Sequence, residues 1–241
     1  MQELLAPLSS PSLKDVFIER FENLILSGQL KIGQKLPSER ELALRLGVSR
    51  PVVHSGLVDL EAKGLITLMP RVGAVVNDYR QEGSLALLNS LVTYQQGRLE
   101  DDLQESLLDM RLLFEVETAR LAALHREEDH LGALDDVIAQ EARVPRHDVA
   151  RLAALDFQFH HLLALASGNR IYPLLLNSFK HVYLNLAAQF FEDPAVAENV
   201  HAFHREMRIG IENRDPAATA AVMKRMLAHG AEHLREMCRI L

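Results

Sequence analysis

The sequence has a single cysteine, Cys238, among its 241 residues. One cysteine can form neither an internal disulfide nor a cysteine-based zinc finger, and such sparse use fits the reducing cytoplasm. No apolar run approaches the roughly 18 residues that a membrane span needs. The first twelve residues also lack a basic region followed by an apolar core. We therefore expect a cytoplasmic protein with no membrane partner.

Common enzyme signatures are missing as well. The sequence contains no HExxH, no G-x-S-x-G and no phosphate-cradling glycine loop. It shows no repeat of fixed period and no low-complexity stretch. With 48% hydrophobic and 24% charged residues, it has the composition of an ordinary globular protein, and its length suits two domains.

The net charge of -7 is spread unevenly along the chain. Residues 1–80 hold ten Lys and Arg against nine Asp and Glu, whereas residues 81–241 hold 16 against 24. Ten of the eleven histidines also lie beyond residue 80. Residues 31–73 carry a local charge of +3, which is modest but permits contact with DNA phosphates.

The first third of the chain predicts three short helices. Apolar residues three and four apart predict a helix over 13–26. Ser38 and Glu41 have the spacing of a capping box at the start of a second helix, which ends at Gly47. Ser49 can cap a third helix, whose buried stripe is Val53, Leu57 and Leu60.

The second and third helices, joined by a glycine turn, predict a helix-turn-helix. Two β-prone runs follow, at 65–68 and 74–76, and predict a hairpin or wing. Beyond residue 83 the pattern is helical throughout. We therefore predict a mainly α protein with four parts: an N-terminal tail (1–12), a winged helix-turn-helix (13–77), a linker (78–83) and an all-α effector and dimerisation domain of six or seven helices (84–241).

A helix that enters the major groove needs exposed side chains for base edges and cations for phosphates. We expect the third helix to present Ser49, Arg50, Pro51, His54 and Ser55 to DNA, with Arg50 on a guanine or a phosphate. Arg40 is placed to hold a phosphate, and Arg71 with Gly73 at the wing tip to reach the minor groove or a phosphate. The alternative is that these are solvated charges on a small helical domain.

Residues 33–42 (GQKLPSEREL), 46–50 (LGVSR), Gly64-Leu65 and Gly73 resemble the winged helix-turn-helix of the GntR transcription regulators. The resemblance covers about residues 13–77. It implies a homodimer that reads a palindromic operator in double-stranded DNA, usually as a repressor relieved by a ligand. The recognition helix departs from the family's common Arg-Glu-Ala by having His54-Ser55-Gly56, and a central glycine should cost about 1 kcal/mol relative to alanine.

Residues 110–115, 156–160 and 166–169 resemble the helical ligand domain (FCD type) of the FadR subgroup. That resemblance implies an acidic metabolite as the effector and a divalent metal (Zn, Ni or Mn) held by an Asp, a His four residues later and two further histidines. Asp156, His160 and His204 match three ligand positions. Met226, a weak soft ligand, occupies the fourth, and His229 one turn later is the substitute.

We expect two residues to bind the effector directly, Arg111 as a carboxylate clamp and Asn169. The alternative for Arg111 is a buried ion pair with Glu115 or Asp156. Residues 166–177 and Asp193-Pro194 instead resemble the branch of the subgroup that binds long-chain acyl-CoA without a metal. The segment that handles CoA in that branch is not recognisable in residues 230–237, so both effector classes remain open.

Two other function classes are weaker hypotheses. A metal-dependent hydrolase or lyase could use Asp156, His160 and His204, but the sequence offers no catalytic motif beside them. A nonspecific architectural DNA-binding protein conflicts with the large acidic second part. We therefore predict a ligand-responsive, sequence-specific transcription regulator and not an enzyme.

Overall fold

The computed structural model describes residues 12–94 and 101–240. The chain divides into two compact units, Met1–Arg98 and Leu99–Leu241, each with its own hydrophobic core. Among the described residues no helix is both long and apolar enough to cross a membrane. The predicted tail lies outside the described residues except for Ser12, and so does the side chain of Cys238.

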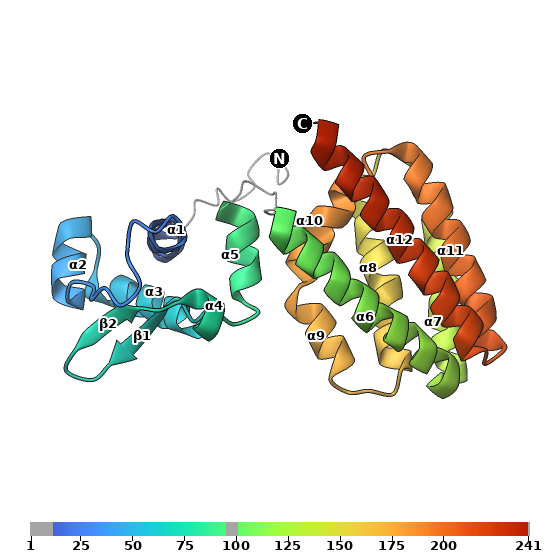
Figure 1. Cartoon of the computed structure of the whole chain (residues 1–241), viewed down its shortest axis with the longest axis horizontal. Helices are drawn as coiled ribbons and strands as arrows, with labels where there is room; N and C mark the ends of the chain where they lie inside the picture. The colour runs from blue at the N-terminus through green and yellow to red at the C-terminus, as the bar shows by residue number, and fades with distance from the viewer. Residues whose placement is uncertain (1–11, 95–100, 241) are drawn as a thin grey trace, which may run out of the picture. The chain divides into compact units, whose positions relative to one another are not determined.

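The first unit is a winged helix-turn-helix, as predicted, followed by two further helices (Figure 1). Its elements are α1 (Leu13–Leu26), α2 (Glu39–Leu46), α3 (Arg50–Ala62), β1 (Ile66–Met69), β2 (Gly73–Val76), α4 (Tyr79–Glu82) and α5 (Leu87–Tyr94). The two strands are antiparallel, with Ile66 opposite Val76 and Met69 opposite Gly73. Lys35 forms a further antiparallel bridge with Val75, so the segment before α2 runs along the wing.

The helix ends follow the local sequence signals with two exceptions. Ser38 caps α2 by accepting from the backbone N of Glu41 at 3.3 Å, and Gly47 ends this helix with φ 66°. The Glu41 carboxylate pairs with Arg45 at 2.5 Å and does not complete a capping box with Ser38. A reciprocal capping box is present at α1, between Ser12 and Asp15. Ser49 is the N-cap residue of α3, but its side chain makes no capping hydrogen bond, which corrects the sequence prediction.

The unit's core lies between α1, α3 and the wing. Phe17 and Phe21 of α1 stack on each other and are buried, as are Val53, Leu57 and Leu60 of α3. The Phe17 ring lies directly over Gly56, where a Cβ atom would meet the ring at 2.3 Å. The glycine therefore allows α1 and α3 to approach closely.

The first compact unit extends beyond the linker that we expected at 78–83. That segment contains the single turn of α4, and α5 then packs against α1. Leu87 joins the first core, and Ser90 Oγ donates to Glu22 Oε1 at 2.8 Å. The Lys63 ammonium pairs with Glu22 and donates to Ser90 Oγ at 3.0 Å. These contacts fasten α5 to α1 and to the end of α3.

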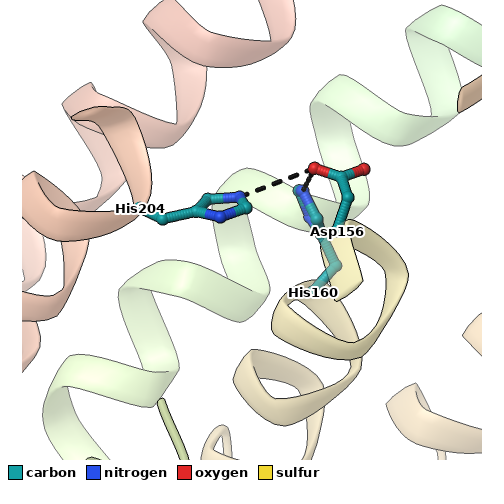
Figure 2. Close-up of side chains that lie close together, drawn as sticks. All are labelled: Asp156, His160 and His204. Carbon is teal, nitrogen blue, oxygen red and sulfur yellow. Dashed lines mark ion pairs between the residues drawn. The ribbon is translucent and has the colours of Figure 1, made fainter. Parts of the chain in front are cut away.

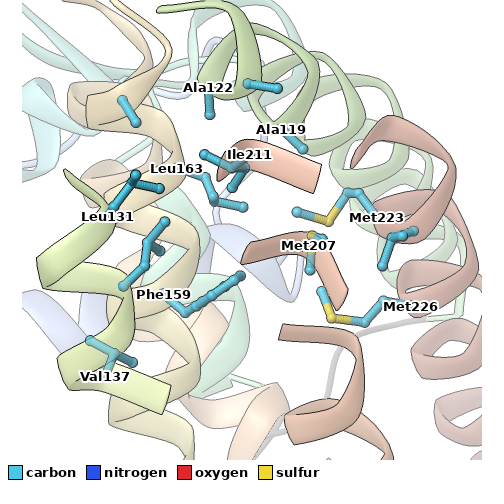
Figure 3. Close-up of a cluster of buried hydrophobic side chains, with 14 of the residues drawn as sticks. Ala119, Ala122, Leu131, Val137, Phe159, Leu163, Met207, Ile211, Met223 and Met226 are labelled. Atoms are coloured by element: carbon cyan, nitrogen blue, oxygen red, sulfur yellow. The ribbon is translucent and has the colours of Figure 1, made fainter. Parts of the chain in front are cut away.

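The second unit is a bundle of seven described helices. They are α6 (Asp101–His125), α7 (Glu128–Glu141), α8 (Val149–Ala166), α9 (Tyr172–Ser178), α10 (Lys180–Phe190), α11 (Pro194–Glu212) and α12 (Pro216–Ile240). The range 84–241, for which we expected six or seven helices, also includes α5, which belongs to the first unit. Helix α8 runs through the bundle and contacts α6, α7, α9 and α10, while α12 lies along α6 and α11 (Figure 1). Figure 3 shows the core, to which Phe159, Met207 and Met226 contribute.

Candidate functional site

The third helix presents its polar residues as the sequence predicted. Arg50 and His54 are exposed and one helical turn apart, Pro51 is exposed and Ser55 is half-buried. Glu39, the first residue of α2, contacts both side chains. Its Oε1 is 2.8 Å from His54 Nδ1, and its Oε2 is 3.8 Å from Arg50 Nη2. A carboxylate thus holds His54 on this face, a contact that no local sequence spacing indicates.

The other predicted DNA-contacting residues are also on the surface of the first unit. Arg40 and Ser49 are exposed at the starts of α2 and α3. Arg71 and Gly73 are exposed at the wing tip, both with positive φ (65° and 105°). Arg71 is one of only two non-glycine residues with positive φ in the described part of the chain, which reflects the tightness of this turn.

The second unit contains a buried cluster of Asp156 and His160 from α8 and His204 from α11 (Figure 2). One ligand atom of each residue lies within 4.8 Å of the others. Asp156 Oδ1 is 3.9 Å from His160 Nε2 and 3.6 Å from His204 Nε2. The spacing of four residues places Asp156 and His160 on one helix face, as predicted, and packing brings His204 to them.

Each histidine of the cluster has a second carboxylate on its other ring nitrogen. His160 Nδ1 pairs with Glu115 of α6, and His204 Nδ1 lies 2.9 and 3.1 Å from the two oxygens of Glu141 of α7. The Phe159 ring stacks on His204 with centroids 3.7 Å apart and fixes its orientation. The two Nε2 atoms, which are directed at Asp156, are buried and have no hydrogen-bond partner.

Further charged contacts surround the cluster. Tyr183 donates to Asp156 Oδ2 at 2.6 Å, and burial together with this carboxylate raises the pKa of Tyr183 well above its ordinary value. Arg111 Nε donates to Glu115 at 2.6 Å, while its guanidinium carbon lies 4.6 Å from the centre of the Tyr183 ring. The structure shows the ion pair of Arg111 with Glu115, and the role of Arg111 as a carboxylate clamp stays a prediction.

The pKa values of this ion-pair network follow from competition between burial and charge. Burial alone would raise the pKa of Glu115, but Arg111 and His160 outweigh it and lower this pKa from 4.5 to about 2. Burial likewise opposes the charged form of His160, but the Glu115 carboxylate raises the pKa of His160 above its ordinary 6.5. Glu115 therefore remains ionised beside Arg111 and His160.

A small cavity of about 40 Å³ opens beside the cluster. Arg111, Asp156 and His160 form its polar end. The rest of its wall is largely apolar and consists of Leu186, Ala187, Phe190, Val200, Met226, Leu227, Gly230 and Leu234. This combination of a few polar groups and an apolar wall suits a small ligand with a charged head and an apolar body.

The remaining predicted residues do not join the cluster. Met226 is buried in the core and forms part of the cavity wall (Figure 3). The His229 ring packs instead beside Phe190 and Phe203, with centroids 6.1 and 6.2 Å away. Asn169 is outside the cavity wall, in the loop after α8, where its Oδ1 accepts from the backbone N of Ile171 at 2.9 Å.

Two residues of the site were missed in the sequence. Glu141 and Tyr183 come from α7 and α10, far along the chain from the residues that they contact. No periodicity or spacing links them to the cluster, so only the packing of the helices identifies them.

Two family models together match nearly the whole chain. The model described as bacterial regulatory proteins, gntR family, matches residues 14–76, and the FadR C-terminal domain matches residues 77–239. The two matches meet between residues 76 and 77, just before the linker that we predicted at 78–83. The second match also exceeds half of the chain.

Curated relatives carry the same class of function. The Glc operon transcriptional activator of Escherichia coli is 34% identical over 176 residues, covering 71% of this chain and 67% of the relative. The HTH-type transcriptional regulator Mce2R of Mycobacterium tuberculosis is 28% identical and covers 92% of each chain. The fatty acid metabolism regulator protein of Yersinia enterocolitica is 28% identical, covering 73% of this chain and 71% of the relative.

Solved structures support the fold. The Lar protein of Listeria monocytogenes aligns with a TM-score of 0.65 at 18% identity, covering 95% of this chain and 99% of the other. The matched families and relatives are transcriptional regulators rather than enzymes, which confirms the class that the sequence predicted. The chain therefore belongs to the GntR family of bacterial regulatory proteins, with a FadR-type C-terminal domain, and is a ligand-responsive, DNA-binding transcriptional regulator.

Proposed function

We propose that the effector domain senses a small carboxylate through a divalent metal held by Asp156, His160 and His204. One observation carries this proposal: two buried Nε2 atoms without partners are directed at one carboxylate oxygen, while each Nδ1 is held by another carboxylate. Carboxylates on the outer nitrogen are the usual way in which proteins orient metal-binding histidines. Two imidazoles and a carboxylate suit Zn, Ni or Mn.

The charges of the site favour the same proposal. Glu115, Glu141 and Asp156 are buried carboxylates, and among the described residues Arg111 is the one arginine that pairs with any of them, through Glu115. Buried charge is stable only when it is compensated, so a divalent cation would supply the missing positive charge. Three protein ligands leave coordination positions for an effector carboxylate, which the metal would bind as a Lewis acid.

The ligand positions also explain why Met226 is tolerated. A thioether is a poor partner for these metals, and Met226 packs in the hydrophobic core beside the cavity. The proposed site therefore consists of three protein ligands, and His229 is not required. This makes His229 the natural control residue for experiments on the cluster.

In the same proposal the protein is a cytoplasmic homodimer and a repressor. Two copies of α3 and the wing would read a palindromic operator through Arg40, Ser49, Arg50, Pro51, His54, Ser55, Arg71 and Gly73. The effector would change DNA affinity only if it binds the two domain arrangements unequally. Release of the operator on ligand binding is the expected direction.

An acyl-CoA effector is the second candidate. The apolar wall of the cavity favours it, as do the match to the FadR C-terminal domain and the 28% identity to a fatty acid metabolism regulator. In that case the acyl chain would pack against the apolar wall of the cavity, and the response would not need a metal.

The anisotropy of a fluorescent DNA fragment from the gene's own upstream region distinguishes these candidates. The protein is first stripped with a chelator and then tested with and without Zn, Ni or Mn, against short monocarboxylates and against a long-chain acyl-CoA. We expect a carboxylate response only with metal, lost in Asp156→Asn and kept in His229→Asn.

Two results would contradict the proposal. A metal-independent response to acyl-CoA would favour the second candidate instead. If binding to the upstream DNA is neither salt-sensitive nor resistant to competitor DNA, the protein does not recognise an operator there.

A further inference from the structure

We propose that Glu39 holds His54 as a hydrogen-bond acceptor that selects adenine or cytosine at one position of each operator half-site. The inference rests on the proposed placement of α3 in the major groove. It concerns how a single position is read, which the placement of the helix does not itself decide.

The geometry around His54 fixes the role of one of its ring nitrogens. Glu39 Oε1 lies 2.8 Å from His54 Nδ1. An ionised carboxylate can only accept a hydrogen bond, so the proton of the neutral ring resides on Nδ1. The other nitrogen, Nε2, then carries a lone pair and can only accept.

The exposure of His54 makes that acceptor available to a partner. The His54 side chain is 62% exposed, whereas the Glu39 side chain that holds it is 32% exposed. The ring is thus anchored at Nδ1 while most of the side chain stays exposed. An anchored ring loses less conformational freedom on binding than a free one, because its orientation is already set.

The bases differ in the hydrogen-bonding groups that they present in the major groove, so an acceptor on the protein prefers some bases over others. Adenine and cytosine present exocyclic amino donors there, whereas guanine and thymine present oxygen or nitrogen acceptors. Nε2 of the Nδ1-protonated ring therefore matches an adenine or a cytosine and opposes a guanine or thymine. A freely rotating or protonated ring would not discriminate in this direction.

Arg50 extends this argument to a second base. It lies one helical turn before His54, and its Nη2 is 3.8 Å from Glu39 Oε2, beyond hydrogen-bond distance. Its guanidinium carries donors alone, which match the two acceptors of guanine. The face of α3 thus combines a donor residue and an acceptor residue one turn apart.

Selection of binding sites from a randomised DNA library, with the full chain, tests the inference. We expect the wild type to prefer adenine or cytosine at one position per half-site by about fivefold, the lower end of side-chain discrimination. His54→Ala should remove the preference at that position alone. Glu39→Gln should weaken it below about twofold, because an amide can both donate to and accept from the ring.

Glu41→Gln is the matched control. Glu41 lies in the same turn of α2 but pairs with Arg45 instead of a residue of α3. It should leave the preference at every position unchanged. Thermal unfolding of each variant verifies that the exposed substitutions leave the fold intact.

The tautomer itself provides a second readout, which a merely structural role for Glu39 would not change. In a long-range proton–nitrogen NMR spectrum, the His54 ring, assigned by its absence in His54→Ala, should carry its proton on Nδ1. In Glu39→Gln it should populate both tautomers.

Three results would overturn the inference while leaving the proposed function intact: an Nε2-protonated ring in the wild type, a guanine or thymine at the position that His54→Ala affects, or no change with His54→Ala. If the wild type selects no sequence, both the inference and the proposed operator recognition fail.

Discussion

The Phe17 ring covers Gly56 so closely that a Cβ atom on the glycine would lie 2.3 Å from Phe17 Cδ1. Phe17 is buried and stacked on Phe21, with ring centroids 4.5 Å apart, so the ring has little room to move. The glycine that breaks the helical pattern of the recognition helix is therefore a packing residue between α1 and α3.

Gly56→Ala should consequently destabilise the DNA-binding unit. Helix propensity alone predicts a gain of about 1 kcal/mol. Overpacking typically costs about 1–3 kcal/mol, so we expect a net loss of about 1 kcal/mol. Urea unfolding followed by circular dichroism measures it. Gly132→Ala is the control, because a Cβ there meets nothing within 4 Å and should stabilise α7. Stabilisation by Gly56→Ala would contradict the packing account.

Two arginines cap each other's helices in the effector domain. Arg126, just after α6, donates to the carbonyl of Glu212 at 2.9 Å, and Arg214, just after α11, donates to the carbonyls of Leu124 and Arg126 at 2.9 and 3.1 Å. Arg214 has φ 52°, a conformation that is strained for any residue but glycine.

We expect Arg126→Ala to lower the free energy of unfolding by about 2 kcal/mol, as for hydrogen bonds from charged groups. Arg214→Ala should cost about 1–2 kcal/mol, and Arg214→Gly about 1 kcal/mol less, since glycine relieves the strained φ. Urea unfolding measures the stability of each variant and tests whether Arg214→Gly is more stable than Arg214→Ala. Arg225→Ala, which breaks an exposed pair with Glu206, should change little. If Arg214→Gly is less stable than Arg214→Ala, the backbone of Arg214 is not strained as described.

Ser90 attaches α5 to the DNA-binding unit through Glu22 and Lys63. Ser90→Ala should cost about 1 kcal/mol, the usual value of a hydrogen bond, and should act mainly on α5. Hydrogen exchange of the peptide covering Leu87–Tyr94 should therefore become faster, while α2 and α3 stay protected. Ser178→Ala in α9, whose hydroxyl is exposed, is the control. Unchanged exchange in α5 would show that this contact does not hold the helix.

Glu115 predicts a pH dependence of stability. Its folded-state pKa of about 2 lies below its ordinary 4.5. The stabilisation is therefore fully present above about pH 5 and is lost as the pH falls toward 2. Glu115→Gln should cost about 3–5 kcal/mol at pH 7, because Arg111 loses its buried partner. The difference in the free energy of unfolding between the wild type and Glu115→Gln should shrink by about 3 kcal/mol between pH 5 and 2.

Urea unfolding at a series of pH values measures this deficit. Glu117→Gln is the control on the same helix, since Glu117 forms an exposed pair with Arg120. If Glu115→Gln shows the same acid dependence as the wild type, Glu115 is not ionised in the folded protein as described.

Much of the fold could be predicted because its signals are local. Ser38 and Gly47 mark the two ends of α2, and the four-residue spacing of Asp156 and His160 places both on one face of α8. The role of Ser49 was predicted less well, because a capping residue type at the right position need not make the capping bond.

The rest depends on contacts between residues distant in the sequence. Glu141 orients His204 from 63 residues away, and Glu39 reaches His54 across the turn between α2 and α3. Leu87 joins the first core although it lies beyond the predicted linker. Such pairs have no periodicity, so the three-dimensional packing alone reveals them.

Native mass spectrometry of the purified protein tests the central claim most directly, because one spectrum reports both the oligomeric state and any bound metal. After incubation with Zn, Ni or Mn we expect a dimer with one metal ion per chain. The ion should be absent in Asp156→Asn and retained in His229→Asn. A metal-free wild type, or metal retained equally in Asp156→Asn, would contradict the proposed metal centre.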